Sequence, residues 1–562
     1  MKVQKREGKQ FVKQLLKALS QSIEGDISTS EDDLTYYSTD GGVFSLMPTA
    51  VVFPRDVNDV SAMVKLVDAA NQNGGDRISL TARGNGTDQG GGPINTGIIV
   101  DFMRYMNQIL EIGEDYAVVQ PGCLYGRLQK ELRQRGRYIP SYPASVEVST
   151  IGGAIANNAA GEKTVKYGAT RKYVDALQVV LADGTVTWLH AVDQQELQEK
   201  KKLAGLEGAI YRELEKLIAD NYDVIHTNHP HVTKESAGYA LWKVAQGGHF
   251  NVAEVVVGSQ GTLCFVTAIR LKTVAAPDPN KVDLLVSYYD SIENAGLAAQ
   301  DLHRLDPSAL EIVDSHLITL VNREKPELLK NLIPGDKTPA VVLLCEFDEQ
   351  NDVLRADKVN RAQVVIRQYA YDSVLKKTPE EEAEAWKLRR SAAAVMWTIP
   401  GNKKALPIIE DGTVPPHKLT EFIRRAYEIF EKYNLEIAIW GHAGDADLHM
   451  QPFMDLSKVS DRKKLFAMTD EFYKMVHELG GTAAGEHNDS LMRAVYRPLM
   501  FGPEMENLFN QVKMIFDPEN MLNPHKKVGV DFNYIKRHLR HEYSIESLAK
   551  IERLKARETI DR

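Results

Sequence analysis

The chain has 562 residues, of which 43% are hydrophobic and 26% are charged. This composition is typical of an ordinary globular protein, and the length allows two or more cores, because single cores stop growing at roughly 250–300 residues. The formal net charge of −9, from 68 basic and 77 acidic residues, argues against a general nucleic-acid-binding role.

Cysteine content and hydropathy bear on the bound groups and on the cellular environment of the protein. Cys123, Cys264 and Cys345 lie far apart and form no CxxC pair. A disulfide framework, a Cys-type zinc site and an iron–sulfur cluster ligated by this chain are therefore excluded. No apolar run reaches the roughly 18 residues of a membrane span, and the opening MKVQKREGKQ has no signal-peptide core. We expect a reduced, cytoplasmic environment.

Apolar patterning and turn signals divide the chain into four parts. Residues 1–44 are predicted to be an N-terminal extension, with a helix around FVKQLLKALS and a polar loop over 28–42. Residues 45–275 form a first domain, and residues 276–528 form a second domain after the linker AAPDPNKV. A charged, helical tail is expected over 529–562.

The first domain is predicted to begin with strands and helices in alternation. Paired glycines end the helix that starts near Asp56, and the Asp-Gly pair within VDALQVVLADGTVTWL indicates a hairpin. Other strands expected in the first domain are MPTAVVFP (47–54), RISLTA (77–82), IIVDF (98–102) and YAVVQ (116–120), and a helix is expected at LYGRLQKELRQRG (124–136). In the second domain, strands are expected at AVVLLCEFD (340–348) and EIAIW (436–440).

Two histidines seven residues apart occur in GHAGDADLH (441–449). That spacing would place both on one face of a helix, but the glycines and aspartates between them are poor helix formers. The apolar flanks instead predict a hairpin centred between Asp445 and Ala446, with His442 directly opposite His449 and their Cβ atoms roughly 5 Å apart. Two imidazoles so placed can share one ion; polar packing is the alternative.

The densest glycine signal is TARGNGTDQGGG (81–92). Glycines permit positive φ and let successive backbone N–H groups surround an anion such as a pyrophosphate. The strand GIIVDF follows instead of a helix, so the loop is not the GxGxxG turn of a nicotinamide dinucleotide fold. A plain structural turn is the alternative.

A second run of small residues lies in PASVEVSTIGGAIANNAAGEKTVKYG (143–168). Its glycines and alanines leave little side-chain volume to fill a core. Such a run suits a backbone that lies against a large flat ligand, and a closely packed small-residue helix is the alternative.

The order of these motifs is similar to that of a known family. RGNGTDQGG, VQPGCLYGRL, STIGGAIANNAAG and VVVGSQGTL resemble the FAD-binding domain of the vanillyl-alcohol oxidase and p-cresol methylhydroxylase superfamily. IIEDGTVP, GHAGDADLH, GEHN and FDPENMLNPHK are similar to its branch of FAD-linked D-2-hydroxyacid dehydrogenases. The resemblance implies an α+β fold, with a two-subdomain FAD-binding domain of the p-cresol methylhydroxylase type over 45–275. An antiparallel-sheet α+β cap domain for the substrate would follow over 276–528.

The resemblance also implies the contacts with FAD. Some relatives attach FAD through a histidine, but the matching residue here is Thr87, so non-covalent binding is expected. The pyrophosphate and ribityl part would lie on Arg83, Gly84, Asn85, Gly86, Thr87, Asp88, Gly90 and Gly91. The flavin would be lined by Pro143, Ser145, Thr150, Gly152, Gly153, Asn157, Ala160 and Gly161, with Tyr167 nearby, the adenine side by Gly258, Gly261 and Thr262, and the isoalloxazine edge by Asn523.

A third metal ligand is implied at Glu486, because the resemblance places AAGEHNDS beside the histidine hairpin. His442, His449 and Glu486 would leave coordination positions open, as a catalytic site requires. These ligand types suit zinc, with Mn²⁺ and Fe²⁺ also compatible. A 2-hydroxyacid offers such an ion a carboxylate and a hydroxyl, whose proton the ion would acidify.

His487 matches the family histidine that lies near the flavin and the substrate carbon. It is expected to accept the hydroxyl proton as hydride leaves for flavin N5, with metal ligation as the alternative. Arg389 matches the family's substrate arginine and would bind the substrate carboxylate, with Lys404 as a possible second cation. Arg390 is expected at the surface or a domain interface.

The chain departs from the family pattern at three places. Gln260 stands where glutamate is common. Ala446-Asp447 replaces a common Gly-Asn pair and adds an acidic group beside the metal. Asn488 replaces a common glycine and puts a side chain where flavin or substrate approaches. Glu410 and Asp411 could orient the histidines or form a buried salt bridge.

The leading hypothesis is FAD-dependent oxidation of a D-2-hydroxyacid of the D-lactate or D-2-hydroxyglutarate type. Electrons would pass to a separate acceptor: a quinone, an electron-transfer protein or an iron–sulfur partner. The alternatives are a redox-neutral flavin-adduct enzyme, like the ether-lipid synthase of the superfamily, and a flavin-binding subunit of a larger complex. The charged tail could dock a partner or a membrane surface, or pack on its own domain. A homodimer is compatible with the sequence.

Overall fold

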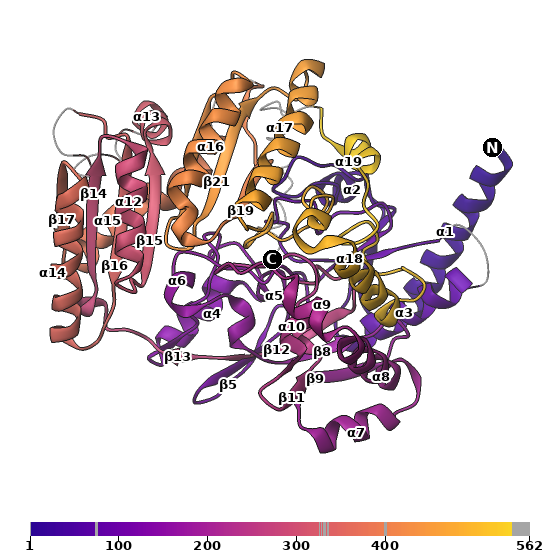
Figure 1. Cartoon of the computed structure of the whole chain (residues 1–562). Coiled ribbons are helices and arrows are strands. Elements are labelled where there is room, and N and C mark those ends of the chain that lie inside the picture. Colours follow the sequence, from indigo (N-terminus) through magenta and orange to yellow (C-terminus); the bar gives the residue numbers. More distant parts are fainter. Residues whose placement is uncertain are drawn as a thin grey trace.

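The computed structural model describes residues 2–541, apart from 73–76, 325, 327, 328, 330–332, 334–336 and 398–401. The N-terminal half carries a four-stranded and a seven-stranded sheet, and the second half carries an eight-stranded sheet. Figure 1 shows the eight-stranded sheet and its helices beside and above the N-terminal half. The predicted α+β class is confirmed.

The four-stranded sheet has the order β1 (Asp26–Ser28), β2 (Ala50–Phe53), β4 (Ile98–Asp101), β3 (Leu80–Arg83). β2, β4 and β3 are parallel, and β1 pairs antiparallel at the edge. Helices α1 (Lys2–Ser22) and α3 (Val57–Gln72) share its apolar core. The strands and the helix predicted here are confirmed, and the glycine-rich loop leaves the end of β3.

The predicted polar loop over 28–42 is wrong in part, because α2 (Glu31–Tyr37) lies within it. Ser30 caps this helix by accepting a hydrogen bond from the Asp33 N–H, and three acidic residues in the first turn suit the helix dipole. Capping residues and an acidic first turn have the composition of a loop, which explains the error. Tyr36 and Tyr37 at the end of α2 are buried.

The seven-stranded sheet is antiparallel throughout. Its order is β10 (Ala245–Gln246), β11 (His249–Asn251), β9 (Val186–Val192), β8 (Val174–Val180), β12 (Phe265–Lys272), β6 (Tyr116–Val119) and β5 (Ile109–Ile112). The predicted Asp-Gly hairpin is confirmed between β8 and β9. The helices of this region are α4 (Tyr125–Arg133), α5 (Ile151–Asn157), α6 (Thr164–Tyr167), α7 (Gln194–Lys202), α8 (Gly205–Asp220), α9 (Tyr222–Thr227), α10 (Leu241–Val244) and α11 (Ala253–Val256).

The eight-stranded sheet is also antiparallel. Its strands are β17 (Asp372–Lys376), β14 (Asp283–Tyr289), β16 (Val341–Phe347), β15 (Ala309–Asp314), β20 (Ile437–His442), β21 (Asp447–Met454) and β18 (Lys404–Ala405) in order, with β19 (Ile409–Thr413) also paired to β21. One face packs against α12 (Ile292–His303), α14 (Asp352–Tyr369), α16 (Leu419–Lys432) and α17 (Val459–Glu478). The other face packs against α13 (Ser315–Glu324) and α15 (Pro379–Trp397).

The junction between the halves lies between two short strands. β13 (Val274–Ala275) pairs with β7 (Arg137–Tyr138) of the first half, and β14 begins the second sheet at Asp283. The domain boundary at 275/276 stays a prediction.

Residues 41–45 join the glycine-rich loop to the C-terminal end of the described chain. Ser45 N–H donates to His538 O (2.9 Å) and Arg540 N–H to Val43 O (2.8 Å), just after α19 (Phe532–His538). Gly41 N–H donates to Asp88 O (2.8 Å). The expected N-terminal extension therefore supports the loop. The expected helical tail begins with α19, and its part beyond 541 lies outside the described residues.

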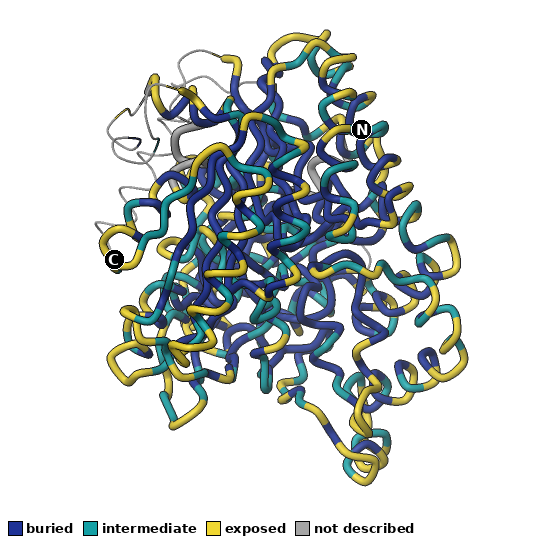
Figure 2. The backbone as a smooth tube through the Cα atoms, turned by 60° about the vertical axis from the view of Figure 1, so that its left-hand side comes forward, coloured by how far each residue is buried: buried dark blue, intermediate teal, exposed yellow. Residues whose placement is uncertain are grey.

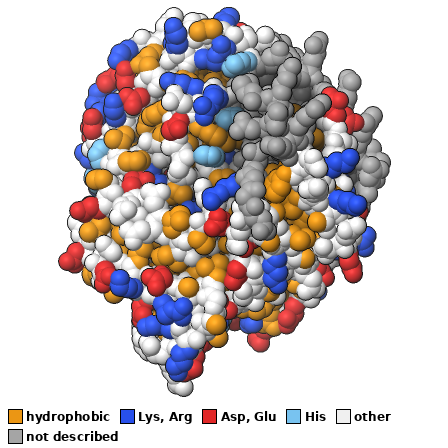
Figure 3. Space-filling model, turned by 90° about the vertical axis from the view of Figure 1, so that its right-hand side faces the viewer, with side chains coloured by type: hydrophobic (Ala, Val, Ile, Leu, Met, Phe, Trp, Pro, Cys, Tyr) orange, Lys and Arg blue, Asp and Glu red, His pale blue; other side chains and the backbone are white. Residues whose placement is uncertain are grey.

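Burial follows the sheets. Figure 2 shows buried strands through the interior and exposed loops around them. On the face drawn in Figure 3, acidic and basic side chains are interspersed, with no broad field of one sign. None of the described helices is long and apolar enough to cross a membrane.

Candidate active site

A pocket lies between the glycine-rich loop and helix α5. Its empty volume is about 860 Å³ with its opening to solvent included. The residues predicted for FAD that line it are Arg83, Gly84, Asn85, Gly86, Thr87, Asp88, Thr150, Gly152, Gly153, Asn157 and Gly261. The glycine-rich loop and α5, which are far apart in the sequence, thus line the same pocket.

Glycine is required where the loop passes α5. A Cβ on Gly84 would lie 2.2 Å from Thr150 Oγ1, and Gly86 has a φ of +67°. Asp88 holds the loop by accepting from the N–H groups of Gly90 (3.0 Å) and Gly92 (2.8 Å). The backbone therefore comes close to the pocket along this stretch, which fits a long dinucleotide such as FAD.

The other residues predicted for FAD lie outside this lining: Gly90, Gly91, Pro143, Ser145, Ala160, Gly161, Tyr167, Gly258, Thr262 and Asn523. Asn523 donates from Nδ2 to Gly92 O (3.0 Å) and Gln260 O (2.7 Å), so it joins two pocket loops. The Tyr167 hydroxyl donates to Asp348 of the second half (2.7 Å). Their direct contacts with FAD stay predictions.

The predicted metal ligands meet at the end of the β20–β21 hairpin. Glu486 Oε1 lies 3.1 Å from His442 Nε2 and 3.3 Å from His449 Nε2, and all three residues are buried. The ligand atoms lie within 4.8 Å of one another, so one ion could be held by all three. The donor set of two imidazoles and one carboxylate fits the predicted divalent metal.

The predicted hairpin register is wrong by two residues. His442 pairs with Asp447, and His449 pairs with Trp440. The cause is a longer loop, in which Ala446 takes a left-handed φ of 51° and Gly444 N–H donates to Leu310 O (2.9 Å). A shift of two keeps both histidines on one face, and they meet as diagonal neighbours with ring centroids 5.5 Å apart.

Each candidate ligand histidine has a carboxylate behind it. Glu311 Oε1 lies 2.7 Å from His442 Nδ1, and Glu410 Oε2 lies 3.7 Å from His449 Nδ1. A hydrogen-bonded carboxylate such as Glu311 fixes the tautomer and orientation of a metal-ligating imidazole, whereas Glu410 Oε2 and His449 Nδ1 form no hydrogen bond within the described residues. Glu311 was missed from the sequence. Its signal is a charged residue inside the apolar strand ALEIVD, where it is fully buried.

A second possible ligand set, Glu410 with His449 and His487, is less suited to an ion. Arg493 Nη1 lies 3.2 Å from Glu410 Oε1, and His487 Nδ1 lies 2.8 Å from the same oxygen. A cation there would face the guanidinium, so Glu410 is better suited to orient imidazoles.

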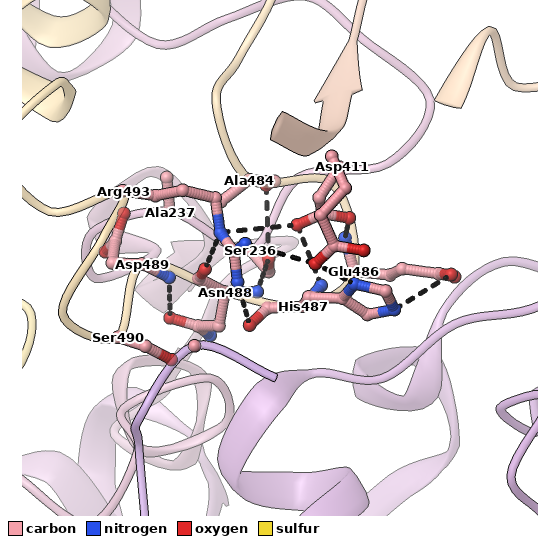
Figure 4. Close-up of polar contacts among 12 residues, drawn as sticks. Ser236, Ala237, Asp411, Ala484, Glu486, His487, Asn488, Asp489, Ser490 and Arg493 are labelled. Atoms are coloured by element: carbon pink, nitrogen blue, oxygen red, sulfur yellow. Dashed lines mark hydrogen bonds and ion pairs between the residues drawn. The ribbon is translucent and has the colours of Figure 1, made fainter. Parts of the chain in front are cut away.

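His487 lies beside the candidate metal ligands. Its ring stacks on His449, with centroids 4.9 Å apart, and its backbone N–H donates to Asp411 (2.9 Å). In Figure 4 the side chains of Glu486 and His487 lie together, on the opposite side of the view from Arg493. Burial alone would lower the pKa of His487, but Glu410 and Asp411 raise it to about 10. A divalent cation held by His442, His449 and Glu486 would instead lower the pKa of His487.

Asn488, which follows His487, joins the loop that carries Glu486 and His487 to the pocket. Asn488 donates from Nδ2 to Asn157 O (3.1 Å) and Gly258 O (2.9 Å), and its Oδ1 accepts from Lys527 (2.6 Å). The Asn488 side chain is thus held by backbone of the first half. Gln260 makes a similar link, because its Nε2 donates to Ser490 Oγ (2.6 Å).

The predicted substrate cations occupy different places. Arg389 is buried, and its Nε donates to Glu311 Oε2 (2.6 Å), which brings it to the back of His442. Arg390 pairs with Glu162 of the first half (2.6 Å), as expected for an interface residue. Lys404 is buried in β18 opposite Met454. Met454 and His449 are an odd number of residues apart, so they project from opposite faces of β21.

Lys234 is a buried cation that sequence reasoning missed. It belongs to the segment between α9 and α10, and its Nζ lies 2.8 Å from Glu486 Oε2 and 3.2 Å from Asp447 Oδ2. Burial would lower its pKa, but these carboxylates and Asp445 raise it above the ordinary value. The extra negative charge of Asp447 is thus balanced by a lysine from the N-terminal half.

Comparisons with known proteins agree with this arrangement. The family model of the C-terminal domain of FAD-linked oxidases matches residues 278–527, and that of an FAD binding domain matches residues 48–190. The D-2-hydroxyglutarate dehydrogenase of Escherichia coli (strain K12) is 29% identical over 535 residues, which cover 92% of this chain and 52% of that protein. The chain thus spans about half the length of the curated relatives it matches first.

A shorter relative and a solved structure extend the likeness. The glycolate oxidase subunit GlcD of Bacillus subtilis (strain 168) is 29% identical over 497 residues, which cover 87% of this chain and 90% of that protein. The crystal structure of p-cresol methylhydroxylase with substrate bound has a TM-score of 0.67 at 15% identity, over 94% of this chain and 98% of that one. At this identity the structural likeness shows the fold.

Proposed function

Since the chain belongs to the FAD-linked oxidases, with an FAD binding domain followed by their C-terminal domain, we propose that it oxidises a D-2-hydroxyacid to the 2-oxoacid. The observation that carries the proposal is the buried His442–His449–Glu486 set with His487 stacked beside it. The loop that carries Glu486 and His487 reaches the pocket through the hydrogen bond from Asn488 to Asn157 O. The relatives' names support this class of substrate.

The two bound groups would supply separate chemistry. FAD, held non-covalently along the glycine-rich loop and α5, would accept a hydride at N5. A divalent metal, most simply zinc, would be held by His442, His449 and Glu486 and would acidify the substrate hydroxyl.

His487 would take the proton of the substrate hydroxyl. Glu410, 2.8 Å from its Nδ1, leaves Nε2 to face the substrate. With His487 as the proton acceptor and FAD as the hydride acceptor, the oxidation of C–OH to C=O would balance.

Arg389 would bind the substrate carboxylate. Glu311 engages its Nε, so the two terminal nitrogens of the guanidinium remain for a carboxylate. Glu311 also contacts His442, so one side chain would fix both the metal ligand and the substrate arginine. Lys404 projects from the sheet face opposite His449, so it is given no contact with the substrate.

Electrons would leave the flavin for a separate acceptor. A quinone, an electron-transfer protein or an iron–sulfur partner would serve, and a dehydrogenase is favoured over an oxidase. We propose a cytoplasmic site of action, with contact at the membrane surface if the acceptor is a quinone.

The test is product formation from paired enantiomers. The purified protein, with its flavin and metal content measured, is incubated with D- and L-lactate and with D- and L-2-hydroxyglutarate in the presence of an electron-accepting dye. The proposal predicts 2-oxoacid from at least one D-acid and from neither L-acid. Failure of every 2-hydroxyacid in a wider panel, with FAD and metal bound, would leave the adduct-forming and subunit alternatives.

A further inference from the structure

One side chain from the N-terminal half, that of Lys234, lies among the candidate metal ligands of the second half. The segment 233–238 runs between the hairpin loop and the loop that carries Glu486. Thr233 Oγ1 donates to Asp445 O (3.1 Å), Ser236 N–H to Ala484 O (3.0 Å) and Gly238 N–H to Asp489 Oδ2 (2.7 Å). Figure 4 shows Ser236 between Ala484 and Asn488. Lys234 is therefore fixed in place by backbone contacts on both sides.

The two oxygens of Glu486 face different groups. Oε1 faces the Nε2 atoms of His442 and His449 at 3.1 and 3.3 Å, and Oε2 accepts from Lys234 Nζ at 2.8 Å. An ammonium has no lone pair and repels a metal ion. Lys234 therefore competes with an ion for Oε2, and leaves Oε1 to the ion.

Asp447 makes the same lysine necessary for charge balance. Its carboxylate is fully buried and has no hydrogen-bond partner among the described residues, and Lys234 Nζ lies 3.2 Å from it. A buried carboxylate without a nearby cation is costly. Lys234 thus restrains the acidic group that this chain adds beside the cluster.

From this geometry we propose that Lys234 is a positioning residue that keeps Glu486 a one-oxygen metal ligand and keeps Asp447 out of the coordination sphere. Coordination positions then stay open for the two oxygens of a 2-hydroxyacid. This inference rests on the proposed function, because it requires the ion at His442, His449 and Glu486.

The test replaces the bound metal with Co²⁺, whose visible absorption is strong with four or five ligands and weak with six. In the wild-type protein we expect strong bands that change when the 2-hydroxyacid is added. A weak, six-ligand spectrum unchanged by the acid would overturn the inference without any variant. Absence of bound metal from the wild type would overturn the proposed site itself, which separates the two failures.

The variant is Lys234→Met, with Lys243→Met, an exposed lysine on neighbouring α10, as the matched control. We expect Lys234→Met to retain Co²⁺ against a chelator, to lose band intensity, and to raise KM for the acid about tenfold with a smaller change in kcat. The control should match the wild type. Loss of the metal, or an unchanged spectrum and KM, would show that Lys234 has only a structural role.

The double variant Lys234→Met/Asp447→Asn guards against a folding defect, because it removes one charge of each sign from the buried cluster. We expect its spectrum and KM to resemble those of Lys234→Met, since Glu486 Oε2 is still released. Full recovery of both readouts would mean that Lys234 acts through charge alone, and would overturn the positioning role.

Discussion

His449 and His487 stack on one another with ring centroids 4.9 Å apart and planes 10° from parallel. The first is a candidate metal ligand and the second is the candidate base. Glu410 contacts both rings, at 3.7 Å from His449 Nδ1 and 2.8 Å from His487 Nδ1. The candidate metal ligand and the candidate proton acceptor thus share one carboxylate, and His487 is the more exposed of the two.

The first prediction concerns the ligand set. His449→Ala should lose the bound metal and keep FAD, because the pocket residues do not include His449. Activity should fall at least about 100-fold, since Lewis-acid assistance is worth several kcal/mol. Metal content and the flavin absorption spectrum check this. His249→Ala, at an exposed histidine in β11, is the control, and metal retained by His449→Ala would contradict the assignment.

The second prediction concerns the carboxylate behind His442. Glu311→Gln removes the charge that orients His442 and Arg389. Metal affinity should fall on the order of 10–100-fold, as for other partners of ligand histidines. Chelator competition measures it. Glu346→Gln is a matched control, since Glu346 is buried in the same sheet but pairs with Ser308 and Lys163 and not with a candidate metal ligand. Equal loss in both variants would point to general damage to the sheet.

A pH profile tests the role of Glu410. Its negative charge favours the protonated imidazole of His487 and so raises the pKa of His487. Glu410→Gln should therefore lower that pKa, and the acid limb of kcat/KM should move to lower pH by on the order of one unit. An acid limb that stays in place would mean that another group is the base.

Lys526 gives a prediction about stability. Its side chain is fully buried, and its Nζ has no hydrogen-bond partner in the described part of the chain. Burial lowers its pKa from 10.5 to about 7. Between these values the unfolded chain binds more protons than the folded one, so this group makes stability rise with pH, by up to about 1.4 kcal/mol per pH unit.

Lys526→Met removes that contribution. The variant should be more stable than the wild type at pH 7, and its advantage should shrink as the pH rises toward 10. Chemical unfolding of the FAD-bound protein at several pH values measures the difference, with Lys130→Met at an exposed lysine on α4 as the control. An advantage that does not vary with pH would mean that Lys526 stays charged.

Local patterns predicted several of the strands and helices α1, α3 and α4, but distance in sequence limited the prediction of the site. The glycine-rich loop and the His442–His449 pair were found from composition and spacing. The hairpin register was missed because it depends on a contact between Gly444 and Leu310, which no local pattern encodes. Helix α2 was missed because its cap and acidic first turn have a loop-like composition.

The residues that complete the site come from elsewhere in the fold. Glu311 lies 131 residues before His442, and Lys234 lies 252 residues before Glu486. A single sequence, read by itself, gives no sign of such pairings. A charged residue inside an apolar strand was the available clue for Glu311, and Lys234 had none of comparable strength.

The most direct test of the account is anaerobic reduction of the bound flavin by D-lactate and D-2-hydroxyglutarate, before and after removal of the metal by a chelator. We expect one of these acids, or a close D-2-hydroxyacid, to bleach the flavin rapidly, the chelated protein to bleach slowly or not at all, and added Zn²⁺ to restore the rate. Bleaching that is equally fast without metal would contradict the role given to His442, His449 and Glu486.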